Sequence, residues 1–436
     1  MTAALFITFA ITAIMGFPIW IVLVLSCFAG IFLGGSATPM LVIAQRMFPS
    51  VDSFPLLAIP LFMVAGNLME GGGISRRLIN FCNSLLGGFT GGLAMVAVLT
   101  CMLFAAISGS GPATVAALGI ILIPAMINRG GFSAPFASSL MASASSIAIV
   151  IPPSIAFVVY ASITGVSVGD MFMGGWIPGI MMGLSLVIII MIECRKKGIQ
   201  ASKAKSSWGQ RWKSFREAFW GFLMPVIIIG GIYGGVFTPT EAAAVSVVYG
   251  LVVGVFIYRE VKMKDMIDIL VDSGKTTGGI MLIIGAATLF SYVCTVFGIA
   301  QAAQALLLEI SGNKYIFLLI VNVIFLIAGC FVDANSAMYI FIPIMYPVAT
   351  QLGIDPVHFG VIATVNLAIG QVTPPVGVNL FVAIGVSEKL QGLRDKTKVT
   401  IVSMSKAVWP QIVACIIALL LITYVPWFST VLLFGK

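Results

Sequence analysis

Charged side chains are scarce in this chain of 436 residues. Asp, Glu, Lys and Arg together make up 9% of it, whereas an ordinary soluble domain carries about 25%. Hydrophobic residues make up 60%, and several apolar runs approach the roughly 20 residues that a helix needs to cross a bilayer. The composition therefore excludes a soluble globular domain. It predicts an all-α polytopic membrane protein that is embedded in a lipid bilayer.

Groups that usually carry enzyme chemistry are also missing. His358 is the only histidine, no two of the seven cysteines have C-x-x-C spacing, and no H-E-x-x-H sequence occurs. The segment S-G-K-T-T (273–277) resembles part of a phosphate-binding loop, but Ile269 stands where that motif requires glycine. We therefore expect no enzymatic activity, no cofactor and no metal centre built from histidine or cysteine.

The positive charge of the chain is confined to short segments. Its net charge is +8, and the basic residues cluster between the apolar runs. Such clusters mark the cytoplasmic loops of membrane proteins, so we expect no nucleic-acid partner and place 193–217 and 389–406 inside the cell. Counting spans from these loops, 91–127 enters and leaves the membrane at the cytoplasmic face, and 315–350 does so at the opposite face.

One sequence pattern occurs twice, about 225 residues apart. The first copy is I-S-G-S-G-P-A-T (107–114) followed by I-V-I-P-P-S (149–154), and the second is F-V-D-A-N-S-A-M (331–338) followed by Q-V-T-P-P-V-G-V-N (371–379). In lipid, backbone that leaves a helix must find partners in protein, water or ions. Irregular segments at matching positions of two halves are typical of transporter binding sites. The alternative is a pair of glycine and proline kinks that serve only helix packing.

The repeat predicts a transporter fold with an inverted repeat, two re-entrant helical hairpins and two broken helices. Residues 91–170 and 313–388 each contain one hairpin and one broken helix of the predicted transport domain. The scaffold and connecting segments are 1–90, 171–274, 275–312 and 389–436, of which the last holds a basic loop and the final helix. Three segments with mixed apolar and charged residues are predicted to be amphipathic helices at the membrane surface: 36–50, 193–217 and 259–272.

Small polar side chains concentrate at the first hairpin and the first helix break. A hairpin tip exposes the unpaired N–H and C=O groups of two helix ends, to which Ser108, Ser110 and Thr114 add hydroxyl oxygens. Pro152 ends the next helix and frees carbonyl groups of the preceding turn, close to Ser146. Oxygen atoms gathered in this way suit a hard monovalent cation.

Asp333 distinguishes the second hairpin. A carboxylate inside a membrane segment is costly unless it is paired or ion-bound, and it marks a functional site by default. With Asn335, Thr373 and the carbonyl group of Gly370, it forms a predicted second cation site. The alternative is a purely structural hydrogen bond from a helix end to Asp333. Free helix N-termini at the tips and after each Pro-Pro could meet a substrate carboxylate.

Glu241 has a structural explanation instead. In T-P-T-E (238–241), threonine takes the N-cap position, proline the first helical position and glutamate the third. This arrangement is a capping box. We therefore predict a helix start at this position and no ion-binding role for Glu241.

Four motifs give the chain a family resemblance over essentially its whole length. They are I-S-G-S-G-P-A-T-V-A-A-L-G (107–119), I-P-P-S (151–154), F-T-P-T-E-A-A-A-V (237–245) and Q-V-T-P-P-V-G-V-N-L (371–380). In these motifs the chain resembles the large membrane subunit of tripartite ATP-independent periplasmic (TRAP) transporters. The resemblance implies a multi-pass protein of the bacterial inner membrane that imports organic acid anions, with sodium as the coupling ion, by an elevator motion.

The resemblance also implies partners and site residues. The partners are a periplasmic substrate-binding protein and a small four-helix membrane subunit, expected as a separate chain because no four-span extension precedes residue 1. The implied sodium ligands are Ser108, Ser110, Thr114, Ser146 and Pro152 in one site, and Asp333, Asn335, Gly370 and Thr373 in the other. The residues implied near the substrate are Ser154, Thr373, Val376 and Asn379.

The substrate itself is not determined by these motifs, because family members that carry different anions share them. Overall similarity leads us to favour sialic acid (N-acetylneuraminate), with a C4-dicarboxylate as the next choice. Three rival functions are weighed against sodium-coupled import: a proton-coupled anion antiporter or efflux transporter, a channel, and a scaffold without transport activity. A proton-coupled protein needs titratable groups in its core, and only Asp333 fits that requirement.

Overall fold

Helices make up all the regular structure that the computed structural model describes, which covers residues 2–33, 41–196, 198, 206–395 and 397–433. Within these ranges, eight helical segments are long and apolar enough to cross a membrane. The all-α membrane fold predicted from the composition is thereby confirmed at this level. The placement of hairpins relative to the bilayer and the elevator motion stay predictions.

The chain has two halves that use the same order of elements. The helices of the first half are α1 (Thr2–Ile14), α2 (Ile19–Leu33), α3 (Leu41–Val51), the 3-10 turn η1 (Phe54–Leu57), α4 (Ala58–Gly71), α5 (Ile74–Leu86), α6 (Gly92–Ser108), α7 (Gly111–Asn128), α8 (Ala134–Ser146), the 3-10 turn η2 (Ile147–Ile149), α9 (Ile155–Thr164) and α10 (Val168–Lys196). The helices that follow are α11 (Trp208–Tyr233), α12 (Pro239–Leu251) with a π-helical end η3 (Val252–Ile257), α13 (Met263–Val296), α14 (Ile299–Ser311), α15 (Lys314–Phe331), α16 (Ala334–Gln351), α17 (Pro356–Gly370), α18 (Val378–Lys389), α19 (Ile401–Tyr424) and α20 (Trp427–Thr430).

Helices α5 to α10 correspond in order to α14 to α19. Gly73 and Gly298 precede α5 and α14 with φ of 74° and 71°, a backbone conformation that glycine adopts without steric cost. The pairs α6–α7 and α15–α16 are helix–turn–helix units, and the helices after them stop before a Pro-Pro that is cis in both halves. The two hairpins and the two helix interruptions therefore lie where the repeated motif predicted them.

Two predicted surface helices are wrong as separate elements where the structure describes them; residues 197 and 199–205 of the segment 193–217 lie outside the described residues. The capping box of Ser207 and Gln210 starts α11, and this helix continues without interruption to Tyr233. Its charged first turns are held in line because Phe215 and Phe222 both pack against Phe81 of α5, at ring-centroid distances of 5.9 and 5.1 Å.

The segment 259–272 is likewise mostly the beginning of the 34-residue helix α13. No proline interrupts it, and the predicted boundary at residue 274 falls inside it. The segment 36–50 lies partly outside the described residues, and its described part forms α3. The capping box predicted at 238–241 is confirmed, because Thr238 and Glu241 cap each other's backbone groups.

The helices that precede the two breaks lie at the centre of the molecule. All residues of α8 except Pro135 are buried, as is α17 from Val357 to Gly370. A helix that is buried on every side must satisfy its polar groups within the protein. Helix α8 does so in part through Ser138, which lies 2.8 Å from Ser387 of α18, and through Ser139, which accepts a hydrogen bond from Gln411 of α19. The hydroxyl group of Ser143 has no partner among the described residues.

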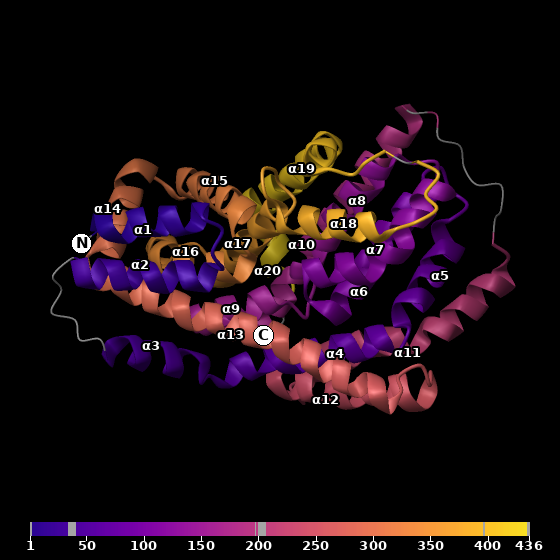
Figure 1. Cartoon of the computed structure of the whole chain (residues 1–436), viewed down its shortest axis with the longest axis horizontal. Helices are drawn as coiled ribbons and strands as arrows, with labels where there is room; N and C mark the ends of the chain where they lie inside the picture. Colours follow the sequence, from indigo (N-terminus) through magenta and orange to yellow (C-terminus); the bar gives the residue numbers. More distant parts are fainter. Residues whose placement is uncertain (1, 34–40, 197, 199–205, 396, 434–436) are drawn as a thin grey trace.

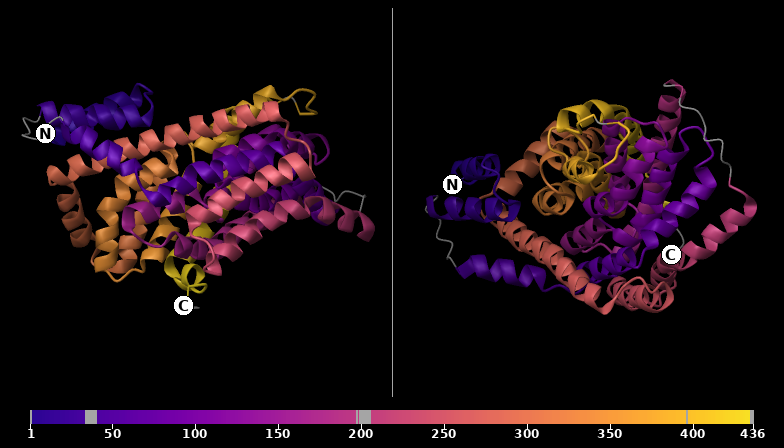
Figure 2. Two further views of the ribbon diagram at one scale, coloured as in Figure 1. Left: turned by 90° about the horizontal axis from the view of Figure 1, so that it is seen from below. Right: turned by 45° about the vertical axis from the view of Figure 1, so that its right-hand side comes forward.

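Helix α13 runs obliquely past this centre and forms one side of the molecule (Figure 1; Figure 2). Its 34 residues correspond to a length of about 51 Å. It packs against α2, α3, α4 and α16, and α4 packs in turn against α12. We call the interface at which α4 and α13 face α9 and α16 the seam, because the functional site lies along it.

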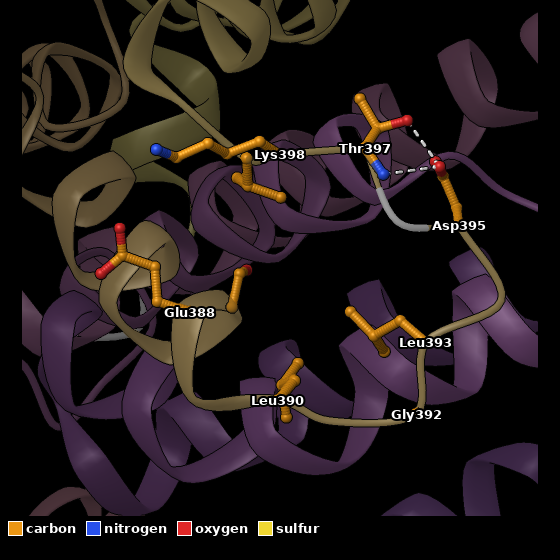
Figure 3. A pocket seen from close by; sticks show the side chains of 9 residues that line it. Glu388, Leu390, Gly392, Leu393, Asp395, Thr397 and Lys398 are labelled. Atoms are coloured by element: carbon orange, nitrogen blue, oxygen red, sulfur yellow. Dashed lines mark hydrogen bonds between the residues drawn. The ribbon is translucent and has the colours of Figure 1, made fainter.

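The loop between α18 and α19 is bound to the corner between α7 and α8 (Figure 3). Asp395 accepts hydrogen bonds from the backbone N–H of Ala134 at 2.8 Å and from Thr397, and the Asn128 side chain accepts one from the backbone of Arg394. The loop, with Glu388 and Lys398, lines a cavity of about 290 Å³. Because Ser133 makes no side-chain cap, Asp395 acts as the cap of α8.

Asp395→Ala is expected to lower the stability of the protein by about 1 kcal/mol, the usual cost of removing a helix cap. Asp395→Asn keeps one acceptor oxygen and is expected to cost less. The hydrogen bonds from Thr397 and Ala134 lower the pKa of Asp395 below its usual 3.8. Its charge therefore stabilises the fold above that pH and ceases to do so as the pH falls through the lowered pKa. Thermal unfolding in detergent at pH 7 and at a pH well below 3.8 checks both statements, and an equal loss in both variants would contradict them.

Candidate functional site

Each hairpin tip lies against the helix break of its own half. Helix α6 ends at Gly109, whose φ is 62°. An added Cβ on Gly109 would lie 2.6 Å from the carbonyl oxygen of Pro153, so only glycine fits between the first tip and the first break. In the second half, the N–H of Gly377 donates to the carbonyl oxygen of Cys330 at 3.0 Å. Each hairpin tip therefore contacts the helix break of its own half.

The first tip also meets the second break. An added Cβ on Gly111 would lie 2.8 Å from Nδ2 of Asn379 and 3.2 Å from Oε1 of Gln371. Asn379 in turn lies 3.3 Å from the hydroxyl group of Ser145 on α8. The two halves of the chain therefore contribute residues to one shared site.

Both tips and both breaks border one small cavity in the seam. Its volume is about 90 Å³. It is lined by Met63, Gly109, Ser110, Gly111, Pro112, Ile149, Ile155, Ala156, Thr276, Ile280, Asp333, Ala334, Asn335 and Gln371. Asp333 is the only charged residue among them. A ligand site for an organic molecule usually measures about 300 Å³ or more, so this cavity has room for ions and water and not for a bulky anion.

Asp333 is the N-cap of α16. Its carboxylate accepts hydrogen bonds from the backbone N–H groups of Asn335 and Ser336, at 3.0 and 3.2 Å, and from the hydroxyl group of Ser336. The structural role named above as the alternative is therefore real. It leaves the carboxylate half-buried at the wall of the cavity, where it can also face a cation.

Three side-chain amide oxygens near the cavity have no hydrogen-bond donor among the described residues. They belong to Asn335, Gln371 and Asn379, and each is shielded from solvent. A buried acceptor without a donor costs about 1–3 kcal/mol, unless a water molecule or a cation fills the place. Oxygen donors of this kind, beside one carboxylate, suit a hard cation such as sodium. Among the described residues no cluster of histidine, cysteine and carboxylate groups fits a transition metal.

The structure brings together some of the sequence-predicted site residues and not others. Ser110, Asp333 and Asn335 line the cavity, and Asn379 lies beside it at Gly111. The residues that do not line it are Ser108, Thr114, Ser146, Pro152, Ser154, Gly370, Thr373 and Val376.

Several of these residues have local bonding instead. The hydroxyl groups of Thr114, Ser146 and Thr373 donate to carbonyl oxygens three or four residues earlier in the chain. Ser154 caps α9, and its hydroxyl group donates to the carbonyl oxygen of Ile149 across the first break. Their roles as ligands stay predictions.

Gln371 and Thr276 are cavity residues that were not singled out from the sequence. Gln371 begins the motif Q-V-T-P-P, and a polar amide next to a helix break was a usable signal. Thr276 belongs to the polar segment S-G-K-T-T, which follows the charged first turns of α13. Helix α13 thereby contributes the wall of the cavity opposite the tips.

The chain resembles known proteins over most of its length. A family model described as "Tripartite ATP-independent periplasmic transporter, DctM component" matches residues 6–428. The chain is 39% identical over 431 residues to the C4-dicarboxylate TRAP transporter large permease protein DctM of Rhodobacter capsulatus, which covers 96% of this chain and 95% of that protein. It is 43% identical over 422 residues to the isethionate TRAP transporter permease protein DctMQ of Oleidesulfovibrio alaskensis, and spans 97% of its own length but 65% of that protein.

A sialic acid relative and a solved structure complete the comparison. The chain is 35% identical over 417 residues to the sialic acid TRAP transporter large permease protein SiaM of Vibrio cholerae, covering 96% of this chain and 95% of that one. Its fold is similar to that of the YdaH transporter of Alcanivorax borkumensis, with a TM-score of 0.64, 14% identity and coverage of 91% and 90%. Overall similarity therefore does not favour the sialic acid relative over the C4-dicarboxylate one.

The fold and the site define a polytopic membrane permease in which two hairpins and two interrupted helices meet at one cavity. The chain belongs to the DctM family, the large permease component of tripartite ATP-independent periplasmic transporters. Its relatives are transporter permeases and not enzymes, and the protein is a multi-pass protein of the inner membrane.

Proposed function

We propose that this permease imports a small organic acid anion and drives the import with sodium. One observation carries the proposal: both tips and both breaks meet at a cavity with a single carboxylate, Asp333, beside amide oxygens that lack donors. Such a set of oxygens attracts a cation and does not by itself attract an anion. A bound cation changes this balance, because it adds positive charge beside the N-termini of α7 and α16.

Coupling follows from the order in which charge is added. Before sodium binds, the carboxylate of Asp333 repels an anion. After sodium binds, the cavity is neutral or positive, and the tips are held together by shared ligands. If the anion-binding geometry forms only with sodium bound, the two ligands are linked thermodynamically and move together.

The proposed motion moves the tips and breaks as one body past α4 and α13. In this proposal α6–α7 and α15–α16 are re-entrant hairpins that open to opposite faces of the membrane. The relatives named above include permeases for isethionate, C4-dicarboxylates and sialic acid. We propose a substrate of this class, delivered by a periplasmic binding protein to a complex that also contains a small membrane subunit.

Uptake by the complete transporter tests this function. The large subunit, the small subunit and the binding protein are reconstituted in proteoliposomes, and uptake of isethionate, malate and N-acetylneuraminate is measured. An inward sodium gradient is expected to drive accumulation of one of these anions, and a proton gradient without sodium is expected to drive none. Accumulation driven by protons alone would favour the proton-coupled alternative, and flux without the binding protein would favour a channel.

A further inference from the structure

A second and larger cavity lies along the same seam. Its volume is about 490 Å³, which is within the range of small-molecule sites. Hydroxyl side chains from separate elements line it, among them Ser53 before η1, Ser162 of α9, Ser291 of α13 and Tyr346 of α16. No carboxylate lines it. Asp52 lies between the lining residues Ser50 and Ser53 but is exposed and is not among the residues that line the cavity. The described lining is therefore polar and uncharged.

This second cavity lies in line with the first. Helix α13 borders the first cavity at Ile280 and the second at Ser291, and α16 borders them at Asn335 and Tyr346. The nearest lining residues of the two cavities are eight positions apart on α13, at Ile280 and Thr288, and four positions apart on α16, at Asn335 and Tyr339, or about 12 and 6 Å along the helices. Because α9 also borders both cavities, they are two places on one path between the same two groups of helices.

The hydroxyl groups of the two walls do not bond to each other. Ser162 and Tyr339, which are 3.0 Å apart, belong to one wall. Thr288 of the facing wall donates to the carbonyl oxygen of Ile284 in its own helix. Among the described residues no side-chain hydrogen bond crosses the cavity from α16 to α13. The facing hydroxyl groups can therefore bond to a molecule held between them.

Arg46 is an exposed residue of α3 that does not itself line this cavity but contacts a residue next to its lining. Its guanidinium carbon lies 4.3 Å from the ring centroid of Tyr292. One helical turn separates Arg46 from the lining residue Ser50, and one turn separates Tyr292 from the lining residue Thr288, so both residues lie on the cavity side of their helices. A guanidinium stacked on a ring keeps its N–H groups free in the plane to receive a carboxylate. The ion pairs seen in the described part of the chain do not involve Arg46.

We propose that this cavity is an outer binding site for a hydroxylated organic carboxylate. Arg46 binds the carboxylate, and the hydroxyl groups of the two walls bind the hydroxyl groups of the ligand. The charge rule places Lys262 and Lys264, near the beginning of α13, at the cytoplasmic face. The site lies toward the other end of α13, which is therefore at the periplasmic face. An anion would occupy it on its way from the periplasm to the central cavity. This role in the path rests on the proposed import function, whereas the preference for anions does not.

Thiol labelling tests the preference for anions without any transport. Ser291→Cys and, separately, Ser53→Cys are introduced into the otherwise unchanged large subunit, assembled with its small subunit. All seven native cysteines are buried, so the unsubstituted protein provides a low background. The probes are two methanethiosulfonates of similar size, one carrying a sulfonate and the other a trimethylammonium group. We expect the sulfonate reagent to react about fivefold faster at both positions, a ratio typical of one nearby charge in a hydrated site.

Arg46→Gln is expected to remove this preference, and Arg46→Lys to keep most of it. Arg129→Gln is the matched control, because Arg129 is exposed at the far end of α7 and is expected to leave the ratio unchanged. Equal rates for the two reagents in the presence of Arg46, or an unchanged ratio in Arg46→Gln, would overturn the proposal. If one cysteine variant does not assemble, the other gives the same comparison.

Uptake distinguishes the site from the function of the whole permease. In Arg46→Gln we expect the KM for uptake to rise about fivefold with an unchanged sodium dependence, while Arg129→Gln behaves like the parent. Failure of all uptake with intact labelling selectivity would contradict the proposed import function and leave the anion site in place. Normal uptake kinetics in Arg46→Gln, with the labelling preference lost, would place the anion site off the transport path.

Discussion

Asp333→Asn abolishes sodium-dependent uptake while the permease stays folded: this is the result that we expect for the central cavity. Asparagine is as good an N-cap as aspartate, so α16 keeps the hydrogen bonds from Asn335 and Ser336 that Asp333 accepts. Only the negative charge at the cavity is removed. Removing one member of a fully buried charge pair costs about 3–5 kcal/mol. Because Asp333 is half-buried, we expect a cost at the lower end of this range, which corresponds to about a 100-fold loss of sodium affinity.

Asp355→Asn is the matched control for this experiment. Asp355 caps α17 and accepts a hydrogen bond from the backbone N–H of His358 at 2.9 Å, so the substitution changes the same group in the same structural role. Asp355 does not line the central cavity. Sodium activation of uptake is measured for both variants in proteoliposomes. Unchanged sodium dependence in Asp333→Asn, or equal losses in the two variants, would remove Asp333 from the ion site.

Gly370→Ala is expected to destabilise the permease by about 3 kcal/mol and to inactivate it. An added Cβ on Gly370 would lie 2.5 Å from the Cα of Gly329 and 2.7 Å from its carbonyl carbon. The clash is with the backbone of α15, so no side chain can turn away, and α15 must separate from α17. Overpacking of this kind usually costs about 1–3 kcal/mol, and more where the backbone must move.

Gly278→Ala is the control, because an added Cβ there has no atom within 4 Å and alanine favours a helix. Thermal unfolding in detergent, followed by the loss of the monodisperse peak, compares the two variants. A melting temperature of Gly370→Ala equal to that of the parent would show that the two helices are not held at this crossing. Gly278→Ala is expected to melt at or above the parent temperature.

The architecture could be predicted from the sequence where the signal is local. Glycine and proline determine backbone conformation directly, so the tips at Gly109 and Asp333 and the breaks at the Pro-Pro pairs were predicted within a few residues. The capping box at Thr238 is equally local. The prediction of separate surface helices at 193–217 and 259–272 was wrong. A run of charged residues indicates that a segment contacts water, but it does not indicate where a helix ends.

The site could be predicted only in part, because its composition depends on contacts between distant segments. Asp333 was found because a lone carboxylate in an apolar segment is conspicuous. Gln371 and Thr276 reach the cavity only through the crossing of the second break with the first tip and the passage of α13 beside both. His358, to which no function was assigned, is buried and bonded to Ser429 and to the carbonyl oxygen of Thr423. No pattern in the sequence indicates that His358 bonds to Ser429 and Thr423.

The burial of α8 on every side has a consequence for the biogenesis of the protein. Its sequence, A-P-F-A-S-S-L-M-A-S-A-S-S, is short and contains five serines, so it gains little by entering lipid alone. It is stable in the membrane only when α18 and α19 supply Ser387, Asn379 and Gln411 as partners. Those partners are synthesised more than 230 residues later. The nascent chain must therefore hold this segment at the insertion machinery, or shield it within the growing bundle, until nearly the whole protein has been made.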